Sequence, residues 1–281
     1  MNLFNIIDEI EEIDPEIHER LSPRRAAIKN ITSFGSKVAM AAMPFALGTL
    51  FKKAYGQTSS TVLDVLNYAL TLEYLEAEFY NQGTAKNVIP AAQRNYIAPI
   101  TRDENAHVAF LKAVIGQLGG TAVAKPNIDL SGGGNASGNG PYKTALTDFP
   151  TFLLLAQVFE DTGVRAYKGQ AGNLLGNQVV LTAALDIHAV EARHASAIRQ
   201  LRYDLGLSTT IRPYIQSTAS LGNDTGFAPV NGNYAGEENV TQGGVNLVSA
   251  LNTSVRIATG SFDEPLEKQA VLDLLVGSFI Y

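Results

Sequence analysis

The sequence predicts an all-α protein whose centre is a four-helix bundle built from a duplicated helical hairpin. Glu73 precedes Tyr80 by seven residues, and Glu160 precedes Tyr167 by seven. Each half also contains one Glu-x-x-His motif, and its Glu lies 31 residues after the upstream Glu in both halves. A single offset of 87 residues therefore aligns two sets of four: Glu73, Tyr80, Glu104 and His107 with Glu160, Tyr167, Glu191 and His194.

The same offset aligns the expected ends of helices. Thr61 and Asp148 are N-cap residues, because their side-chain oxygens can accept hydrogen bonds from the first backbone amides of a helix. Gly119 and Gly206 are C-terminal stops, since glycine readily adopts the left-handed backbone that ends a helix. The repeat therefore covers both the chemistry and the boundaries of each hairpin.

Four helices follow from these boundaries and from the apolar periodicity, at about 61–82, 90–118, 148–171 and 177–205. We expect Gly83 to end the first helix, and a kink or break at Pro99 in the second. The turns inside each hairpin are short, whereas the Gly- and Asn-rich segment 121–143 is a loop by composition. Two short turns and one long crossover predict a bundle over residues 57–206.

The helical period ends after Gly206. Residues 207–260 are rich in Gly, Asn, Ser and Thr, and are expected to form an irregular layer over the bundle. A short last helix should follow the segment 262–265, because Leu266 and Val271 begin an apolar pattern there. The sequence thus predicts that residues 207–281 form an extension packed on the bundle.

Residues 1–56 are predicted to be an export signal and not part of the fold. Arg24 and Arg25 precede the apolar stretch 31–51, and a small-x-small cleavage pattern follows at 54–56. This order resembles a twin-arginine signal, which the export machinery would read before releasing the protein to the periplasm or outside the cell. The alternative is an uncleaved membrane anchor, since the apolar stretch is long enough to span a bilayer.

Composition excludes several classes of function. With 281 residues, 46% of them hydrophobic, the chain can bury a sizeable core. The net charge of −6 argues against nucleic-acid binding. Because there is no cysteine, disulfides, thiolate metal sites and a cysteine nucleophile are excluded, which suits an oxidising compartment or oxidising chemistry.

The paired Glu-x-x-His motifs predict a centre for two metal ions. A Glu and a His three residues apart point from the same face of a helix, so each motif can hold one ion. A Glu from each of the other two helices completes the pattern of dinuclear carboxylate centres. Two divalent cations would also offset the repulsion of four carboxylates buried together. The predicted ligands of two Fe or Mn ions are Glu73, Glu104, His107, Glu160, Glu191 and His194.

The alternative is that these side chains lie on a solvated face. Ala69, Leu72, Ala106 and Val108 leave little polar surface around them, which favours the buried metal centre.

Two tyrosines lie two turns from their glutamates on the same helix faces. We expect Tyr80 and Tyr167 to hydrogen-bond a ligand carboxylate or to act in redox chemistry; ordinary core tyrosines are an equal alternative. Glu76 competes with Glu73 as a ligand, but the offset pairs Glu76 with Gly163. We therefore expect Glu76 on the surface or behind the ligands. His188 has no counterpart in the other half and is left outside the site.

Several segments resemble the ferritin-like domain proteins related to plant desiccation-related proteins. These are LNYALTLEYLEAEFY at 66–80, DENAH at 103–107 and EARH at 191–194, together with FDEPL at 262–266. The resemblance covers about residues 60–281, and the leader resembles that of exported bacterial members. It implies a ferritin-like bundle with a di-iron or di-manganese centre, but implies little about the reaction.

Two classes of function remain open. The first is a redox metalloenzyme that disproportionates peroxide, or oxidises Fe(II) with O2 or peroxide, because oxygen and nitrogen ligands suit both Fe and Mn. The second is a non-catalytic stress protein that keeps the bundle for protection or binding during drying. Storage of iron in a ferritin shell is disfavoured, since the C-terminal extension would obstruct the shell. We prefer the redox site and leave homo-oligomer formation open.

Overall fold

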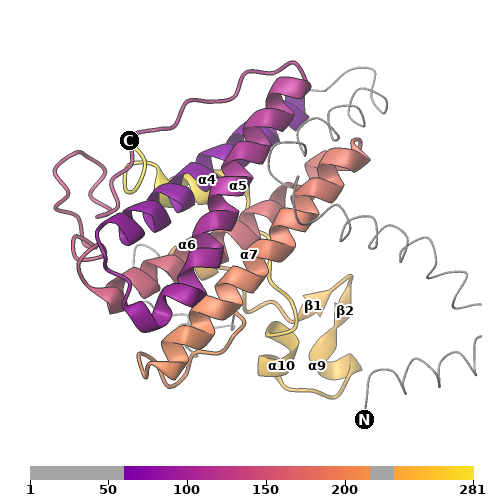
Figure 1. Cartoon of the computed structure of the whole chain (residues 1–281). Helices are drawn as coiled ribbons and strands as arrows, with labels where there is room; N and C mark the ends of the chain where they lie inside the picture. The colour runs from indigo at the N-terminus through magenta and orange to yellow at the C-terminus, as the bar shows by residue number, and fades with distance from the viewer. Residues whose placement is uncertain (1–59, 216–230) are drawn as a thin grey trace, which may run out of the picture. The chain divides into compact units, whose positions relative to one another are not determined.

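The computed structural model describes residues 60–215 and 231–281 (Figure 1). The expected export signal with Arg24 and Arg25, and the alternative anchor at 31–51, lie outside the described residues. Among the helices that are described, none is both long and apolar enough to cross a bilayer.

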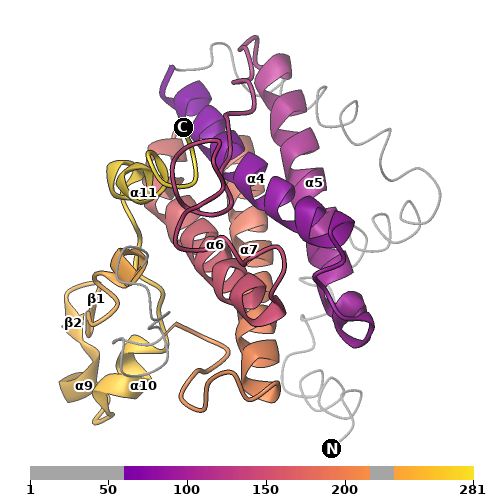
Figure 2. The same cartoon turned by 90° about the vertical axis from the view of Figure 1, so that its left-hand side faces the viewer.

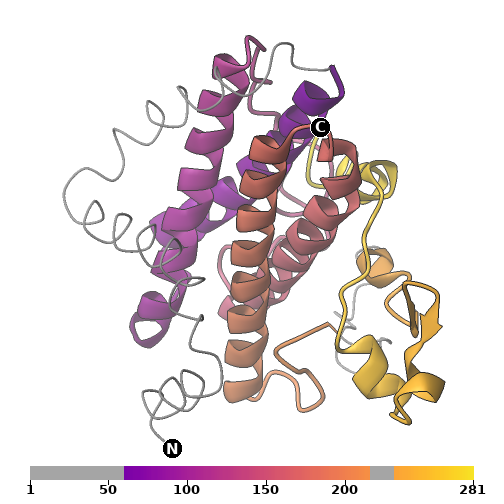
Figure 3. The ribbon, with the colours of Figure 1, turned by 90° about the vertical axis from the view of Figure 1, so that its right-hand side faces the viewer.

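Four long helices form the bundle and confirm the all-α fold class (Figures 1 and 3). Their packing is closest within each hairpin, and the two hairpins are joined by the long connection 118–148. Single turns of 3-10 helix, η1 (Ala91–Gln93) and η2 (Gly172–Leu174), precede the second and fourth helices. The bundle helices are α4 (Ser60–Ala85), α5 (Arg94–Gln117), α6 (Phe149–Ala171) and α7 (Gln178–Asp204).

Local sequence signals account for four of the eight ends of the bundle helices, whereas Thr61, expected as an N-cap, lies within α4. The Asp148 side chain accepts a hydrogen bond from the Thr151 amide at 2.9 Å and caps α6, and Asn177 caps α7 in the same way. Gly119 and Gly206 follow α5 and α7 with φ of 78° and 68°. Such left-handed backbone is strained for other residues, so these glycines end their helices as expected.

The expected stop at Gly83 and the expected break at Pro99 are wrong. Helix α4 continues through Gly83 to Ala85, because this glycine is needed for close packing: a Cβ at this position would lie 2.3 Å from Cε2 of Phe152. Helix α5 is continuous across Pro99. Proline removes one backbone hydrogen bond, and near the start of a well-packed helix that loss does not end it.

The glycine-rich crossover is an ordered loop held by Asp129. Its carboxylate accepts hydrogen bonds from the backbone amides of Ser131 and Gly133, at 2.9 and 3.0 Å, and from the Ser131 hydroxyl at 2.6 Å. The Asp129 amide donates to the Phe279 carbonyl at 2.9 Å. The crossover is therefore tied to the C-terminal end of the chain.

The C-terminal part contains short elements in place of a wholly irregular layer. The two-stranded β-hairpin at 241–246 and the two short helices that follow it lie to one side of the bundle (Figures 2 and 3). The last helix packs on α6 through the buried Val271 and Leu275. The elements are η4 (Gly232–Tyr234), β1 (Thr241–Gln242), β2 (Val245–Asn246), α9 (Leu247–Ala250), α10 (Val255–Thr259) and α11 (Lys268–Leu275).

Arg165 of α6 fastens this C-terminal part to the bundle. Its fully buried guanidinium lies 2.9 Å from the Glu237 carboxylate. It also donates to the carbonyls of Glu264 and Ala235, at 2.8 and 2.6 Å. Gly169, one turn later, has no side chain, so the 264–266 backbone can lie directly on α6. One buried charge and one glycine thus fix the segment that leads into α11.

Candidate metal centre

All six predicted ligands meet in the middle of the bundle. Glu73 comes from α4 and Glu160 from α6, and the two Glu-x-x-His pairs come from α5 and α7. The four glutamates are fully buried, and His107 and His194 are 8% and 6% exposed. The alternative of a solvated face is therefore wrong.

The ligand atoms form two overlapping groups. Glu73 and His107 belong to the first group, Glu160 and His194 to the second, and Glu104 and Glu191 to both. Within each group the candidate donor atoms lie within 4.8 Å of one another. Two ions held in these groups would share two bridging carboxylates.

Glu104 lies between the two histidines. Its Oε2 is 3.1 Å from Nδ1 of His107, and its Oε1 is 2.8 Å from Nδ1 of His194. The terminal carboxylates complete the two ends, with Glu73 Oε2 3.2 Å from the first imidazole and Glu160 Oε2 3.3 Å from the second. Both imidazoles thus direct Nδ1 into the centre.

The unpaired atoms of the site fit metal ions. Among the described residues, Glu104 Oε1, Glu160 Oε2, both oxygens of Glu191 and His194 Nδ1 are buried and make no well-aligned hydrogen bond, although Glu104 Oε1 and His194 Nδ1 lie only 2.8 Å apart. Leaving such groups buried and unpaired costs several kcal/mol each. Lone pairs that converge from carboxylates and imidazoles are a donor set suited to Fe and Mn. These buried acidic and histidine side chains could therefore hold metal ions.

The electrostatics of the metal-free centre favour bound protons. Burial, and then the charge of Glu160, raise the pKa of Glu104 to about 7, although contacts with the two histidines act in the opposite direction. Burial lowers the pKa of His194, but its contacts with Glu104 and Glu160 outweigh burial and raise the pKa to about 11. Protons therefore occupy the site when metal does not.

The two tyrosines pair with the glutamates of the opposite hairpin. Tyr167 donates to Glu73 Oε1 at 2.5 Å, and Tyr80 donates to Glu160 Oε1. Seven residues of helix span about 10 Å, so neither tyrosine reaches the glutamate on its own helix. Because α4 and α6 run antiparallel, each tyrosine lies beside its partner's glutamate. Both hydroxyls thus orient candidate metal ligands.

Asp103 contacts the centre, although the sequence argument did not single it out. Asp103 Oδ2 lies 3.2 Å from Nε2 of His194, an arrangement that orients a metal-binding imidazole. Its counterpart by the offset of 87 is Val190, so the duplication gave no signal for it.

Glu76 is buried, so its expected alternative place on the surface is wrong. It is 3% exposed, and its Oε2 has no hydrogen-bond partner among the described residues. Burial, and then the charge of Glu191, raise its pKa well above the usual value. A Cβ on Gly163 would lie 3.2 Å from Glu76 Oε1 and 2.4 Å from Glu191 Oε2. The glycine that pairs with Glu76 in the repeat therefore makes room for both carboxylates.

His188 lies outside the centre, as expected. Its Nδ1 is 2.9 Å from the Val164 carbonyl, and it belongs to neither group of candidate ligands.

The bundle matches a known family. The family model for the ferritin-like domain matches residues 61–204, a range that contains all four bundle helices and all six candidate ligands. No curated protein matches the chain.

Proposed function

Because the chain belongs to the ferritin-like domain family, we propose that it holds two Fe or Mn ions and uses them in redox chemistry with peroxide or O2. The observation that carries this proposal is the pair of overlapping ligand groups that share Glu104 and Glu191. Two metal ions joined by bridging carboxylates can together supply or accept two electrons, which is the number that reduction of O2 to peroxide, or of peroxide to water, requires.

The residues of this chain have distinct parts in that proposal. Glu104 and Glu191 would serve as ligands to both ions, while Glu73 with His107 and Glu160 with His194 would each hold one. Tyr167 and Tyr80 hold the terminal glutamates by hydrogen bonds. The surrounding core excludes bulk water, which strengthens the interaction of the carboxylates with the ions. Stress protection is the role we propose for this chemistry, with disproportionation of peroxide and oxidation of Fe(II) as the two reactions to distinguish.

Metal analysis is the direct test. Protein produced with both Fe and Mn supplied should carry two ions per chain, and the loaded protein should then evolve O2 from peroxide or consume Fe(II). Protein that carries no metal ion would contradict the metal centre. Bound zinc alone would keep the site but contradict the redox function, because zinc does not change oxidation state.

The same metal titration should depend on pH. Glu104, with a pKa of about 7, and His194, with a pKa of about 11, hold protons in the metal-free protein at neutral pH. Metal must displace those protons, so binding should release protons and should weaken as the pH falls. Calorimetry in buffers of different ionisation enthalpy measures the released protons. Affinity that is the same at about pH 6 and about pH 8 would contradict this arrangement.

We also propose that the protein is exported and acts in the periplasm or outside the cell. Arg24 and Arg25, followed by the apolar stretch 31–51, support this location. The mature protein should begin near residue 57, and Arg24→Lys with Arg25→Lys should leave the uncleaved precursor in the cytoplasm. N-terminal sequencing that finds Met1 on a soluble cytoplasmic protein would contradict export.

A further inference from the structure

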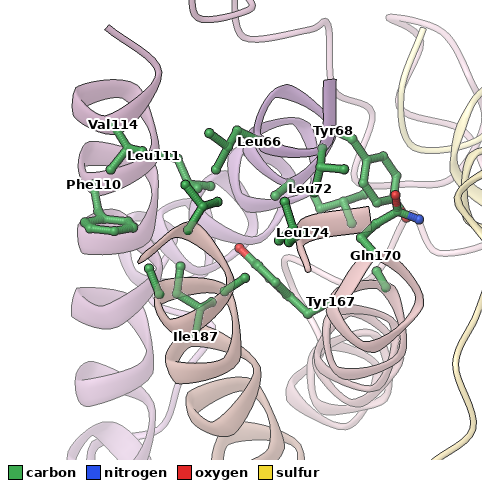
Figure 4. Close-up of a pocket in the computed structure, with 16 residues that line it drawn as sticks. Leu66, Tyr68, Leu72, Phe110, Leu111, Val114, Tyr167, Gln170, Leu174 and Ile187 are labelled. Atoms are coloured by element: carbon green, nitrogen blue, oxygen red, sulfur yellow. The ribbon is translucent and has the colours of Figure 1, made fainter. Parts of the chain in front are cut away.

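An apolar pocket lies between all four bundle helices on the side of Tyr167 (Figure 4). Leu66 and Leu72 of α4, Leu111 of α5 and Ile187 of α7 form its walls, and Tyr167 of α6 lies across it. None of the six candidate metal ligands lines it. The pocket is therefore separate from the metal centre, although it approaches it.

The corresponding place in the other half of the bundle is filled by aromatic rings. Phe79 stacks on Phe152 with a centroid distance of 4.4 Å, and Phe159 packs edge-on against Phe79 at 5.1 Å. Phe79 and Phe152 are fully buried, and Phe159 is 1% exposed. In that half, Tyr80 packs edge-on against Phe79 and Phe152.

The pocket exists because the repeat replaces these rings by smaller side chains. The offset of 87 residues pairs the three phenylalanines with Ala166, Val65 and Leu72, all of which line the pocket. Two further alanines of α7, Ala183 and Ala184, stand at its partly exposed edge. The two halves of the centre therefore differ in access, although their candidate ligands correspond one to one.

Tyr167 connects the pocket to the metal centre. Its ring lines the pocket, and its hydroxyl donates to Glu73 Oε1 at 2.5 Å. Leu72, which also lines the pocket, precedes Glu73 in α4. The side chain of Tyr167 thus separates a molecule in the pocket from the half of the centre formed by Glu73 and His107.

The size and polarity of the pocket select its occupant. The volume of the pocket that is open to the centre of a water-sized sphere is about 20 Å³. By the same measure, a cavity of about 10–15 Å³ holds one water molecule. The polar side chains of the lining belong to Tyr68, Tyr167 and Gln170. Tyr167 bonds Glu73, and the Gln170 side-chain oxygen accepts from Asn173, whereas the Tyr68 hydroxyl has no hydrogen-bond partner among the described residues. One free hydroxyl is fewer partners than a bound water requires. A bound water needs two to four polar partners, so the pocket favours a small apolar molecule over water or peroxide.

We propose that this pocket admits and holds O2 beside the Glu73 and His107 half of the centre. The inference rests on the proposed redox function and narrows it: O2, and not peroxide, reaches the metal ions by this route. Phe110, Ala183 and Ala184 are only partly buried and form the side of the pocket through which the gas enters.

Xenon tests the pocket without any metal or activity. Xenon is apolar and occupies dry cavities of this kind. It should bind among Leu72, Leu111 and Ala166 in the metal-free protein, as seen by crystallography under xenon pressure. Val65→Phe with Ala166→Phe rebuilds the stacked pair of the other half and should remove the bound xenon. If the double variant does not fold, Ala184→Ile, which copies Ile97 of the other half, should weaken xenon binding. A wild-type protein that binds no xenon here overturns the proposal.

The rate of oxidation by O2 tests the route. In Fe(II)-loaded protein the filled variant should be oxidised by O2 at least about tenfold more slowly, a barrier increase of about 1.4 kcal/mol, while oxidation by peroxide should be unchanged. Ala189→Phe, an equal addition on the exposed face of α7, should leave both rates unchanged. An unchanged O2 rate in a variant that has lost xenon overturns the route. Loaded protein that reacts with neither oxidant contradicts the proposed function, and xenon binding then still decides whether the pocket takes apolar gases.

Discussion

Glu104→Gln is expected to abolish binding of both metal ions. The Glu104 carboxylate belongs to both ligand groups and lies within 3.1 Å of both imidazole Nδ1 atoms. The amide keeps the shape of the side chain but loses its charge and one of its two acceptor atoms, so one ion loses a donor and the other keeps only a neutral oxygen. The metal-dependent stability is lost as well, about 2.7 kcal/mol when free metal is a hundredfold above its Kd. Elemental analysis and thermal melts with and without chelator measure both effects.

Matched variants separate a bridging role from a general loss of acidic charge. Glu78→Gln, on the same helix as Glu73 but paired with Lys125, should leave both ions bound. Glu73→Gln should weaken chiefly the ion on the His107 side, because Glu73 belongs to one group only. Glu76→Gln should retain both ions, since Glu76 belongs to neither group. Two tightly bound ions in Glu104→Gln would contradict the bridged arrangement.

The duplication explains why so much of the fold was predictable. Helical periodicity places Glu104 and His107 on one face, and the second copy makes the match far less open to chance than one motif alone. The capping residue Asp148 and the stop at Gly206 are local signals, so they also appear in the sequence. What repeats, and what acts within one turn of a helix, could therefore be predicted.

The remaining features depend on packing between distant segments. Tyr167 bonds Glu73 and not Glu160, which follows only once α4 and α6 are known to run antiparallel. Glu76 shares a helix face with Glu73, but its burial depends on the space left by Gly163 on another helix. The sequence argument took Gly83 as the end of a helix. The structure shows that the glycine makes room for Phe152, a residue of another helix, and that need leaves no signal in the sequence near Gly83. Contacts such as these join segments that are distant in the chain, so they leave no local signal in the sequence.

The C-terminal part shows the same limitation. Arg165 makes hydrogen bonds to parts of the chain that lie between 68 and 100 positions later in the sequence, and its charge is completely buried there. A composition rich in Gly and Asn predicts irregular backbone, but it does not predict which buried charge that backbone will surround. The buried polar network beside α6 and α7 is therefore a finding of the structure, and it leads to a second large expected effect.

Asp161→Ala is expected to destabilise the protein by about 3–5 kcal/mol. Asp161 and Arg199 are fully buried, and the guanidinium makes two hydrogen bonds to the carboxylate, the one from Nε at 3.0 Å. Tyr234 of the C-terminal part also donates to Asp161, at 2.7 Å. Removing the carboxylate leaves a buried guanidinium without its counter-charge and removes one link between η4 and α6. Urea unfolding of metal-free protein measures the loss without a contribution from metal binding.

Two variants make this result specific to the buried pair. Asp186→Ala removes an exposed carboxylate from α7 and should change the free energy of unfolding by less than about 0.5 kcal/mol. Asp161→Leu combined with Arg199→Met removes both charges, and should be clearly more stable than Asp161→Ala, because Arg199 then leaves no uncompensated charge in the core. The cost would then lie in the orphaned guanidinium and not in the lost contact. If Asp161→Ala is no less stable than Asp186→Ala, the buried pair does not contribute to holding the C-terminal part on the bundle.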